Sequence, residues 1–202
     1  MMTETDALLD RLYRTGVDHD AIQSDRASMF LNITPATGQF LALLIGEMQP
    51  ARILEIGTSN GYSTIWLARA AAEFEGRIVS IDQLPYKSTL ARENLAAAGL
   101  VDGVDLVTGD AGAYLASCDD RSFSFLFLDA SRSHYTKWWY EIRRVIDWGI
   151  LVVDNAISHA DEMRDLIGLI RSDTHLNYSI LPIGKGQLVV APAHAASSVA
   201  GI

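Results

Sequence analysis

Two aspartates and an asparagine stand in this sequence where their oxygen atoms could bind a metal ion. Asp129 ends the apolar run FSFLFLD (123–129), and Asp154 with Asn155 ends the apolar run GILVVDN (149–155). If both runs are neighbouring parallel strands, which lie about 4.8 Å apart, their terminal side chains meet at one edge of a sheet. Three oxygen donors of this kind suit Mg²⁺ or Ca²⁺ and suit zinc poorly. The alternative is that each aspartate only caps the helix that follows it.

Arg132 follows Asp129 by three residues, in the polar segment DASRSHY. Its guanidinium, with a pKa above about 12, keeps its proton at pH 7 and cannot act as an ordinary base. Four readings stay open for it: orienting Asp129, stabilising an oxyanion at a metal ion, binding a substrate carboxylate, or lying solvated in a loop. Groups that could accept a proton follow in the sequence, namely His134, Tyr135, Lys137 and His159. A histidine, with a pKa near about 6.5, is chemically suitable.

A glycine-containing turn joins an apolar run to an amphipathic stretch in ILEIGTSNGYSTIWLA. A strand, a turn and a helix in this order place helix N-terminal amides at the carboxyl edge of the sheet, where open α/β sheets bind ligands. The spacing from Gly57 to Gly61 lacks the G-x-G-x-x-G pattern of dinucleotide-binding folds. Glu55 and Asp82 add acids at the same edge, and Asp82 could accept hydrogen bonds from ribose hydroxyls. The alternative is that the glycines only form a tight turn and Asp82 only caps the next helix.

The elements that would position these residues alternate along the chain. Apolar runs predict buried parallel strands at 51–57, 77–82, 104–110, 123–129 and 149–155. The amphipathic stretches between them are long enough for right-handed crossover helices. Two further runs flank Gly-Lys-Gly and predict an antiparallel edge hairpin, at 178–183 and 187–192. Before the first strand, the sequence predicts helices at 4–15, 19–31 and 35–48.

The chain is therefore predicted to be a single α/β domain, residues 1–202, built on a mostly parallel sheet. Residues 1–48 would form a helical cap and residues 49–192 the core. The tail, residues 193–202, has small side chains without a pattern and is predicted to be disordered.

Composition narrows the kind of molecule that this protein binds. The formal charge of −9 and the lack of a Lys/Arg stripe argue against nucleic acid. No apolar run reaches the roughly 20 residues of a membrane span, and the acidic start does not resemble a secretion signal. The lone Cys118 fits a reducing compartment. We expect a soluble, cytoplasmic protein that binds a small molecule, with neither nucleic acid nor a membrane as partner.

An ordered set of short motifs is more specific than any one of them. E-I-G-T-S-N-G-Y-S, followed by S-I-D, G-D-A, L-D-A and V-D-N-A, resembles the S-adenosylmethionine-dependent, cation-dependent O-methyltransferases, the family of catechol and caffeoyl-CoA O-methyltransferases. The resemblance covers roughly residues 29–192. It implies a Rossmann-like class I methyltransferase fold with a seven-stranded sheet, S-adenosyl-L-methionine as cofactor and a divalent cation, Mg²⁺ or Ca²⁺. It also implies a small phenolic or catechol-like acceptor and a homodimer.

The resemblance also assigns residues to the cofactor. The methionine part would be surrounded by Gly57, Ser59, Tyr62 and Ser63, with Ser63 toward its carboxylate. The ribose would bind Asp82, and the adenine would be bordered by Asp110 and Ala111. The segment that covers the cofactor from the N-terminal side would contain Asn32, Ile33 and Thr34. The predicted cofactor-binding set is completed by Glu55, Gly61 and Asp129.

Two positions depart from the family pattern. In many members a lysine, proposed as the general base, follows the first metal-binding aspartate by three residues, and here that position is Arg132. Gly184-Lys185-Gly186 stands where relatives often carry Gly-Asp-Gly, and the sequence suggests no role for the lysine. The predicted catalytic residues are Asp129, Arg132 and His134, and the predicted metal ligands are Asp129, Asp154 and Asn155.

Three hypotheses follow from these residues. The leading one is an O-methyltransferase assisted by a divalent cation. The second is a metal-independent methyltransferase that acts on another nucleophile, with the aspartates as structural caps. The third is a non-catalytic S-adenosylmethionine-binding protein, suggested by the missing lysine. Trp138, Trp139 and Trp148 could line an aromatic acceptor pocket, although their spacing favours packing in the core or at an interface.

Overall fold

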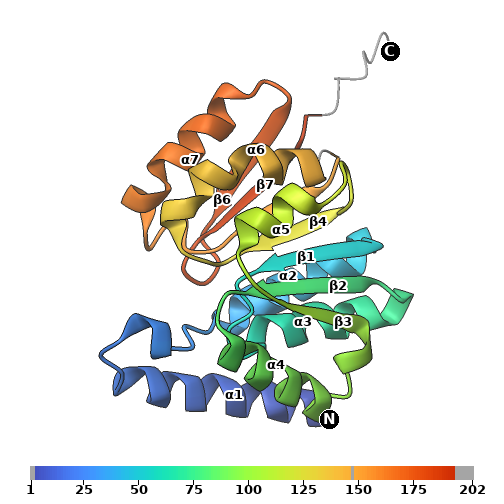
Figure 1. The fold of residues 1–202 in the computed structure, drawn as a ribbon, viewed down its shortest axis with the longest axis vertical. Coiled ribbons are helices and arrows are strands. Elements are labelled where there is room, and N and C mark those ends of the chain that lie inside the picture. Colours follow the sequence, from blue (N-terminus) through green and yellow to red (C-terminus); the bar gives the residue numbers. More distant parts are fainter. Residues whose placement is uncertain (1–2, 147, 194–202) are drawn as a thin grey trace, which may run out of the picture.

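Seven strands form one mixed sheet in the part of the chain that the structure describes, residues 3–146 and 148–193 (Figure 1). The structure is a computed structural model. The strand order is β3-β2-β1-β4-β5-β7-β6. Every pair from β3 to β5 is parallel, whereas β7 is antiparallel to both β5 and β6. This order confirms the predicted mostly parallel sheet with a C-terminal antiparallel hairpin.

The strands span β1 Arg52–Ile56, β2 Arg77–Asp82, β3 Val104–Thr108, β4 Phe125–Leu128, β5 Ile150–Val153, β6 Leu176–Leu181 and β7 Gln187–Pro192. The helices span α1 Glu4–Ala21, α2 Pro35–Met48, α3 Tyr62–Ala71, α4 Pro85–Ala97, α5 Ala111–Ser117, α6 Tyr135–Ile146 and α7 Ala160–Ser172. None of the described helices is long and apolar enough to cross a membrane.

The register of the central strands brings the ends of β1, β4 and β5 to one level. Ile56 pairs with Leu128, and Leu128 pairs with Val153. The ladder continues one step further, since the Asp129 amide donates to the Ile56 carbonyl at 3.0 Å and the Asp154 amide donates to the Leu128 carbonyl at 3.2 Å. Asp129 and Asp154 therefore leave the same edge of the sheet from adjacent strands.

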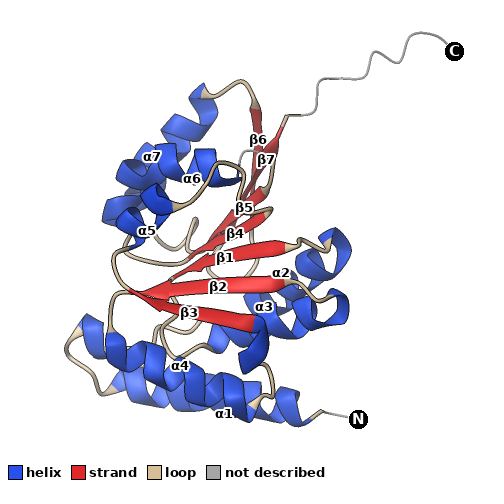
Figure 2. Ribbon diagram, turned by 45° about the vertical axis from the view of Figure 1, so that its right-hand side comes forward, coloured by secondary structure: helices blue, strands red, loops and turns tan. Residues whose placement is uncertain are grey.

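Helices cover both faces of this sheet (Figure 2). The helices α5, α6 and α7 pack on one face, and α1 to α4 pack on the other. In β4, Leu126 and Leu128 join the first core, whereas Phe125 and Phe127 join the second, and all four are fully buried. A strand buried on both faces needs apolar residues at every position, which is why FLFL is an unbroken run.

The N-terminal cap differs from the prediction in its first two helices. Helix α1 continues past the predicted end at residue 15 to Ala21, and the predicted separate helix 19–31 is wrong: beyond the end of α1, this range contains only the 3-10 turn Arg26–Ser28. The Asp20 carboxylate accepts the backbone N–H groups of Phe30 at 2.7 Å and Leu31 at 2.8 Å. Those amides are thereby held outside any helix, and the segment crosses the carboxyl edge of the sheet.

Helix α2 confirms the third predicted helix of the cap. Pro35 occupies its first turn, and the Thr34 hydroxyl caps it by accepting the Thr37 amide at 3.1 Å. Of the tail predicted to be disordered, residues 194–202 lie outside the described residues.

Candidate active site

A cavity of about 440 Å³ opens at the carboxyl edge of the sheet. Its walls come from the turn after β1, the ends of β2 and β4, the loops after β3 and β5, the turn before β7 and the N-terminal segment 26–33. Most of the predicted cofactor residues line it, namely Ile33, Gly57, Ser59, Tyr62, Ser63, Asp82, Asp110, Ala111 and Asp129. Segments far apart in the sequence therefore meet around one space.

Three predicted cofactor residues are not among those that line the cavity. Thr34 caps α2, and Gly61 precedes α3. Glu55 is fully buried behind the cavity, where one carboxylate oxygen accepts hydrogen bonds of 2.5 Å from both Thr64 and Ser80. Its other oxygen has no hydrogen-bond partner among the described residues. Burial raises the pKa of Glu55 to about 7.

The glycines of the turn after β1 are required by other parts of the chain. Gly57 has φ +110°, and a Cβ there would overlap the Asp129 carbonyl oxygen. Gly61 has φ +83°, and its Cβ would lie 3.0 Å from Ala91 in α4. Both glycines therefore have a structural role in the turn, and Gly57 lies against the Asp129 backbone. Gly57 also lines the cavity, so its predicted contact with the cofactor stays a prediction.

Asp82 ties two walls of the cavity together. Its Oδ2 accepts the Ser59 amide at 2.9 Å, and its Oδ1 accepts the Leu84 amide at 3.0 Å. Leu84 precedes the first turn of α4, so the helix-cap interpretation of Asp82 has a structural basis. Each carboxylate oxygen keeps a second lone pair, which leaves Asp82 able to accept a ligand hydroxyl as well.

The acidic cluster contains Asp129, Asp154 and Asn155, and Gln187 joins it from β7. Asp154 is buried, and its two oxygens accept hydrogen bonds from the Asn155 side-chain amide at 2.7 Å and from the Gln187 amide. Asn155 is buried as well and lines the cavity. The Asp129 carboxylate lines the cavity without a hydrogen bond to any described residue.

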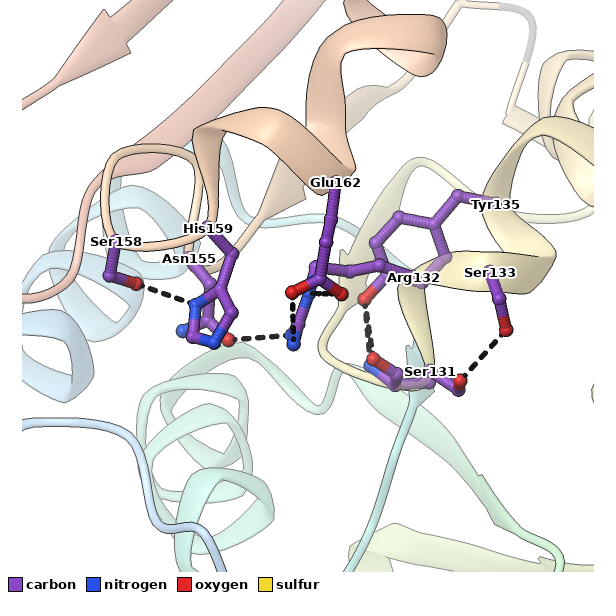
Figure 3. Close-up of polar contacts among 9 residues, drawn as sticks. Ser131, Arg132, Ser133, Tyr135, Asn155, Ser158, His159 and Glu162 are labelled. Atoms are coloured by element: carbon purple, nitrogen blue, oxygen red, sulfur yellow. Dashed lines mark hydrogen bonds and ion pairs between the residues drawn. The ribbon is translucent and has the colours of Figure 1, made fainter.

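Arg132 bonds to Asn155 and not to Asp129. Its Nη1 donates to Asn155 Oδ1 at 3.0 Å, and its Nε donates to the Glu162 carboxylate at 2.9 Å (Figure 3). The Arg132 side chain is only 6% exposed, so it is not a solvated loop residue. The structure gives Arg132 an orienting contact, but its target is Asn155, from the loop after β5.

Electrostatics at the cluster favours the uptake of positive charge. Burial raises the pKa of both Asp129 and Asp154, and for Asp129 the nearby Asp154 carboxylate raises it further. Lys185 and Arg132 act in the opposite direction on both carboxyls without cancelling the rise. A cation between the two carboxylates would relieve their repulsion.

The candidate bases differ in their surroundings. The predicted catalytic residue His134 lines the cavity and stacks on Trp138, with ring centroids 5.1 Å apart. Tyr135 is buried with its hydroxyl bonded to the Ala130 backbone, and burial raises its pKa far above the usual value, which removes it as a base. Lys137 is exposed and does not line the cavity.

His159 lines the cavity from the loop before α7. Its Nδ1 lies 2.9 Å from the Ser158 hydroxyl (Figure 3). Partial burial lowers the pKa of His159, and the charge of Arg132 lowers it further. A neutral imidazole at pH 7 follows, which is the form that can accept a proton.

The three tryptophans divide between the cavity and packing. Trp138 lines the cavity, and Trp139 packs against the core beneath α6. Trp148 is 68% exposed and does not line the cavity. Packing against the core therefore explains the position of Trp139, whereas Trp138 also forms part of the cavity wall.

Several residues at the site carry no prediction from the sequence, among them Arg26, Lys87 and Gln187. Lys87 is buried in the first turn of α4, and its Nζ donates to the Met29 carbonyl at 2.9 Å. Its position in the first helical turn after β2 could have indicated a site residue, because such turns lie at the carboxyl edge of the sheet, where ligands bind. Arg26 and Gln187 reach the site only through tertiary packing, which local sequence patterns do not show.

The residues fit the two groups that the resemblance implies. For the cofactor, acids and amides at the strand ends surround a cavity of suitable position. For a divalent cation, the donor set is two carboxylates and one amide oxygen; Asp129 and Asn155 line the cavity, and Asp154 is buried next to Asn155. Within the described residues, no three His, Cys, Asp or Glu side chains form a metal cluster, so a cation here depends on Asn155.

Known proteins have sequences similar to this chain. The catechol O-methyltransferase of Mycobacterium tuberculosis (strain ATCC 25618 / H37Rv) is 40% identical over 128 residues, and that of Niastella koreensis is 36% identical over 131 residues. These alignments cover 62% and 63% of this chain. They span 57% and 59% of the two relatives, which is less than two thirds of their length.

Solved structures agree on the fold. The cofactor-bound Rv0187 from MTB superposes with a TM-score of 0.76 at 27% identity, over 95% of this chain and 98% of that one. The O-methyltransferase from Bacillus cereus in complex with SAH superposes with a TM-score of 0.74 at 23% identity, over 93% and 91% of the two chains, and this likeness concerns the fold alone. The pattern of the O-methyltransferase family matches residues 4–191, and this chain therefore belongs to that family.

Proposed function

We propose that this protein transfers a methyl group from S-adenosylmethionine to a hydroxyl oxygen of a small acceptor. One observation carries the proposal: a single cavity is lined both by the turn after β1 with Asp82 and by Asp129, Arg132 and Asn155. The first set suits the cofactor, and the second suits an acceptor oxygen. The catechol O-methyltransferases among the similar proteins support a phenolic, catechol-like acceptor.

The residues proposed for the cofactor come from three strand ends. S-adenosylmethionine supplies an electrophilic methyl group on a sulfonium sulfur. Asp82 would accept hydrogen bonds from the ribose hydroxyls, since the Ser59 and Leu84 amides already fix its orientation. Ser63, in the first turn of α3, would lie toward the methionine carboxylate, where helix N-terminal amides favour negative charge. Asp110 and Ala111 would border the adenine.

A divalent cation, Mg²⁺ or Ca²⁺, is part of the proposal. When bound, it would supply positive charge that lowers the pKa of a phenol from about 10 toward neutrality. Asp129, Asp154 and Asn155 would hold it, with Gln187 orienting Asp154 and Arg132 orienting Asn155. The raised pKa of the two carboxyls supports this, because bringing a cation to them favours their ionised forms.

A proton must also leave the acceptor hydroxyl, and we propose His159 as its acceptor. His159 lies next to the acidic cluster, because its backbone amide donates to the Asn155 carbonyl at 3.0 Å, and it lines the same cavity as Asp129. His134 remains a candidate, although its ring is occupied by stacking on Trp138. Arg132, always charged, would stabilise the developing oxyanion.

The direct test is methyl transfer to catechol from S-adenosylmethionine, followed by detection of the methyl ether and of S-adenosylhomocysteine by mass spectrometry. Chelator-treated protein with and without added Mg²⁺ separates cation-assisted transfer from the metal-independent alternative. Absence of transfer to any phenol, with intact S-adenosylhomocysteine binding, would favour the non-catalytic binding protein.

Calorimetry assigns the two halves of the site. We expect Asp154→Ala to abolish Mg²⁺ binding while S-adenosylhomocysteine still binds, and Asp82→Ala to do the reverse. Asp105→Ala, at an exposed aspartate of β3, is the control and should leave both affinities unchanged. A homodimer and a cytoplasmic location remain predictions from the sequence.

A further inference from the structure

Two exposed cationic side chains, Arg26 and Lys185, line the cavity of a chain whose formal charge is −9. Neither forms a hydrogen bond or an ion pair with a described residue. The two buried cations of the cavity, Arg132 and Lys87, are by contrast both bonded to protein groups. Unpaired positive charge on a concave surface attracts a ligand that carries negative charge.

Lys185 stands beside the acidic cluster. Its carbonyl accepts the amides of Ile157 and Ser158, in the loop that follows Asn155, and Lys185 lines the cavity together with Asp129 and Asn155. It therefore lies at the part of the cavity assigned to the acceptor. Without a positive partner, an anionic acceptor would be repelled by the Asp129 and Asp154 carboxylates. Lys185 offsets that repulsion at the place where it acts.

The backbone that presents Lys185 is fixed to the loop after β5. Its carbonyl accepts the Ser158 amide at 3.0 Å, and the Gly186 carbonyl accepts the Ala156 amide at 2.9 Å. Gly186 has φ +96°, and a Cβ there would overlap Ile157. The turn is therefore packed too closely to move aside, and only the side chain of Lys185 is free to meet a ligand.

Arg26 approaches the same region from the N-terminal segment. Its charge acts on His159 and Glu162, as the charge of Arg132 does. The 3-10 turn that carries it is held by a hydrogen bond of 2.6 Å from the Tyr86 hydroxyl to the Ala27 carbonyl. Two cations from opposite ends of the sequence thus line the same cavity as Asp129, Asn155 and His159.

We propose that the acceptor is a hydroxylated aromatic acid, whose carboxylate is bound by Lys185 and Arg26 while its reacting hydroxyl lies at Asp129 and Asn155. This inference rests on the proposed function. The hydroxyl gives its proton to His159, its oxygen forms a bond to the methyl carbon, and the sulfur–methyl bond breaks to leave a neutral thioether. The carboxylate is recognised and is not altered.

A matched pair of acceptors tests the proposal: 3,4-dihydroxybenzoate and its methyl ester, which have the same hydroxyls and differ in charge. We expect the wild-type enzyme to prefer the acid in kcat/KM. Lys185→Met should lower kcat/KM for the acid about ten- to hundredfold, mainly through KM, because a charge-assisted bond is lost. In the same variant, kcat/KM for the ester should change less than about threefold. Lys185→Arg keeps the positive charge and should retain the preference for the acid.

Two further variants serve as comparison. Arg26→Met should act in the same direction as Lys185→Met. Arg92→Met removes an exposed arginine of α4 that is outside the cavity and has no bonded partner among the described residues. It should leave kcat/KM unchanged for both acceptors.

The proposal is overturned if the wild-type enzyme treats acid and ester alike, or if Lys185→Met lowers both equally. It is also overturned if Lys185→Met or Arg26→Met weakens S-adenosylhomocysteine binding in calorimetry, because the cations would then serve the cofactor. Affinity of the acid and the ester for protein loaded with S-adenosylhomocysteine is measured separately. If neither is methylated, the proposed function fails, whereas the binding preference still decides this inference.

Discussion

Arg132 is a permanent cation placed beside a proposed metal ligand. Its Nη1 lies 3.0 Å from Asn155 Oδ1. Since an Mg–O contact is about 2.1 Å, an Mg²⁺ on that oxygen would lie within about 5 Å of Nη1. At an effective dielectric of 20, a double and a single positive charge at that distance repel by about 7 kcal/mol. Glu162, which is 54% exposed, offsets only part of this.

We expect Arg132→Met to bind Mg²⁺ more tightly than the wild type, by at least about tenfold. The lost hydrogen bond to Asn155, worth about 1.5–3 kcal/mol, is smaller than the repulsion that disappears. Calorimetric titration with S-adenosylhomocysteine present measures the change. Arg132→Lys retains the charge and should remain near the wild-type affinity. Weaker binding in the methionine variant would mean that holding Asn155 is the larger effect.

Glu55 makes a separate prediction, for stability against pH. Burial raises its pKa from 4.5 to about 7, so the folded state holds the proton more tightly than the unfolded chain. The contribution of Glu55 to the free energy of unfolding is fully present below pH 4.5 and is lost as the pH rises through 7. The total loss is up to roughly 3 kcal/mol. Glu55→Gln keeps a hydrogen-bonding side chain without a titration.

Urea unfolding between pH 4.5 and 8 tests this. The free energy of unfolding of Glu55→Gln, taken relative to the wild type, should rise with pH over this range. Both proteins contain Asp129 and Asp154, so taking the difference removes most of their titration, and the remainder reflects the effect of the Glu55 charge on the pKa of Asp129. A difference that stays constant with pH would show that Glu55 is ionised in the folded protein.

At the scale of elements, the sequence predicted the strands, but it did not predict several contacts between elements. The run FLFL is apolar throughout because both faces of β4 are covered, and this local pattern correctly predicted that β4 and β5 are adjacent parallel strands. Asp129 and Asp154 therefore follow these strands at the same edge of the sheet. The predicted helix 19–31 failed because the Asp20 carboxylate captures amides 10 and 11 residues away. The Arg132 bond to Glu162 spans 30 residues, a distance at which spacing carries no signal.

The turn after β1 gives a prediction for the element that joins β1 to α3. Gly57→Ala should destabilise the protein by at least about 3 kcal/mol, because its Cβ overlaps the Asp129 carbonyl and its φ is +110°. Gly99→Ala is the matched control: φ is +70° and no heavy atom lies within 4 Å of its Cβ. It should cost only about 1–2 kcal/mol. Thermal unfolding measures the stability of both variants. Equal losses of stability would mean that the cost comes from the positive φ and not from the overlap with the Asp129 carbonyl.

At the scale of the whole molecule, the cavity lies between the strand ends and an N-terminal segment, although the cap helices α1 and α2 pack in the same hydrophobic cluster as one face of the sheet. The core supplies the strand ends, and the N-terminal cap supplies the segment 26–33. Several polar contacts tie this segment to the rest of the chain: Asp20 holds two of its amides, Lys87 donates to the Met29 carbonyl, and the Ser59 hydroxyl donates to the Phe30 carbonyl at 2.7 Å. Further contacts of the segment join Tyr86 to the Ala27 carbonyl, His19 to the Ser28 carbonyl, and the Asn32 side chain to the Leu12 carbonyl. Ser59 and Lys87 also line the cavity. The residues that hold the segment 26–33 are therefore also in a position to contact a bound cofactor.

Ligand binding should therefore protect the cap segment from opening. In the free protein, we expect the Phe30 and Leu31 amides to exchange hydrogen faster than the amides of β4, because only the Asp20 carboxylate holds them. S-adenosylhomocysteine at 100 times its Kd should slow them about 100-fold, if opening releases the ligand. Asp20→Ala removes the acceptor and should leave both amides fast in the free protein. Unchanged exchange of Phe30 and Leu31 on ligand addition would mean that this segment does not close over the cofactor, and that the cavity fills without the cap.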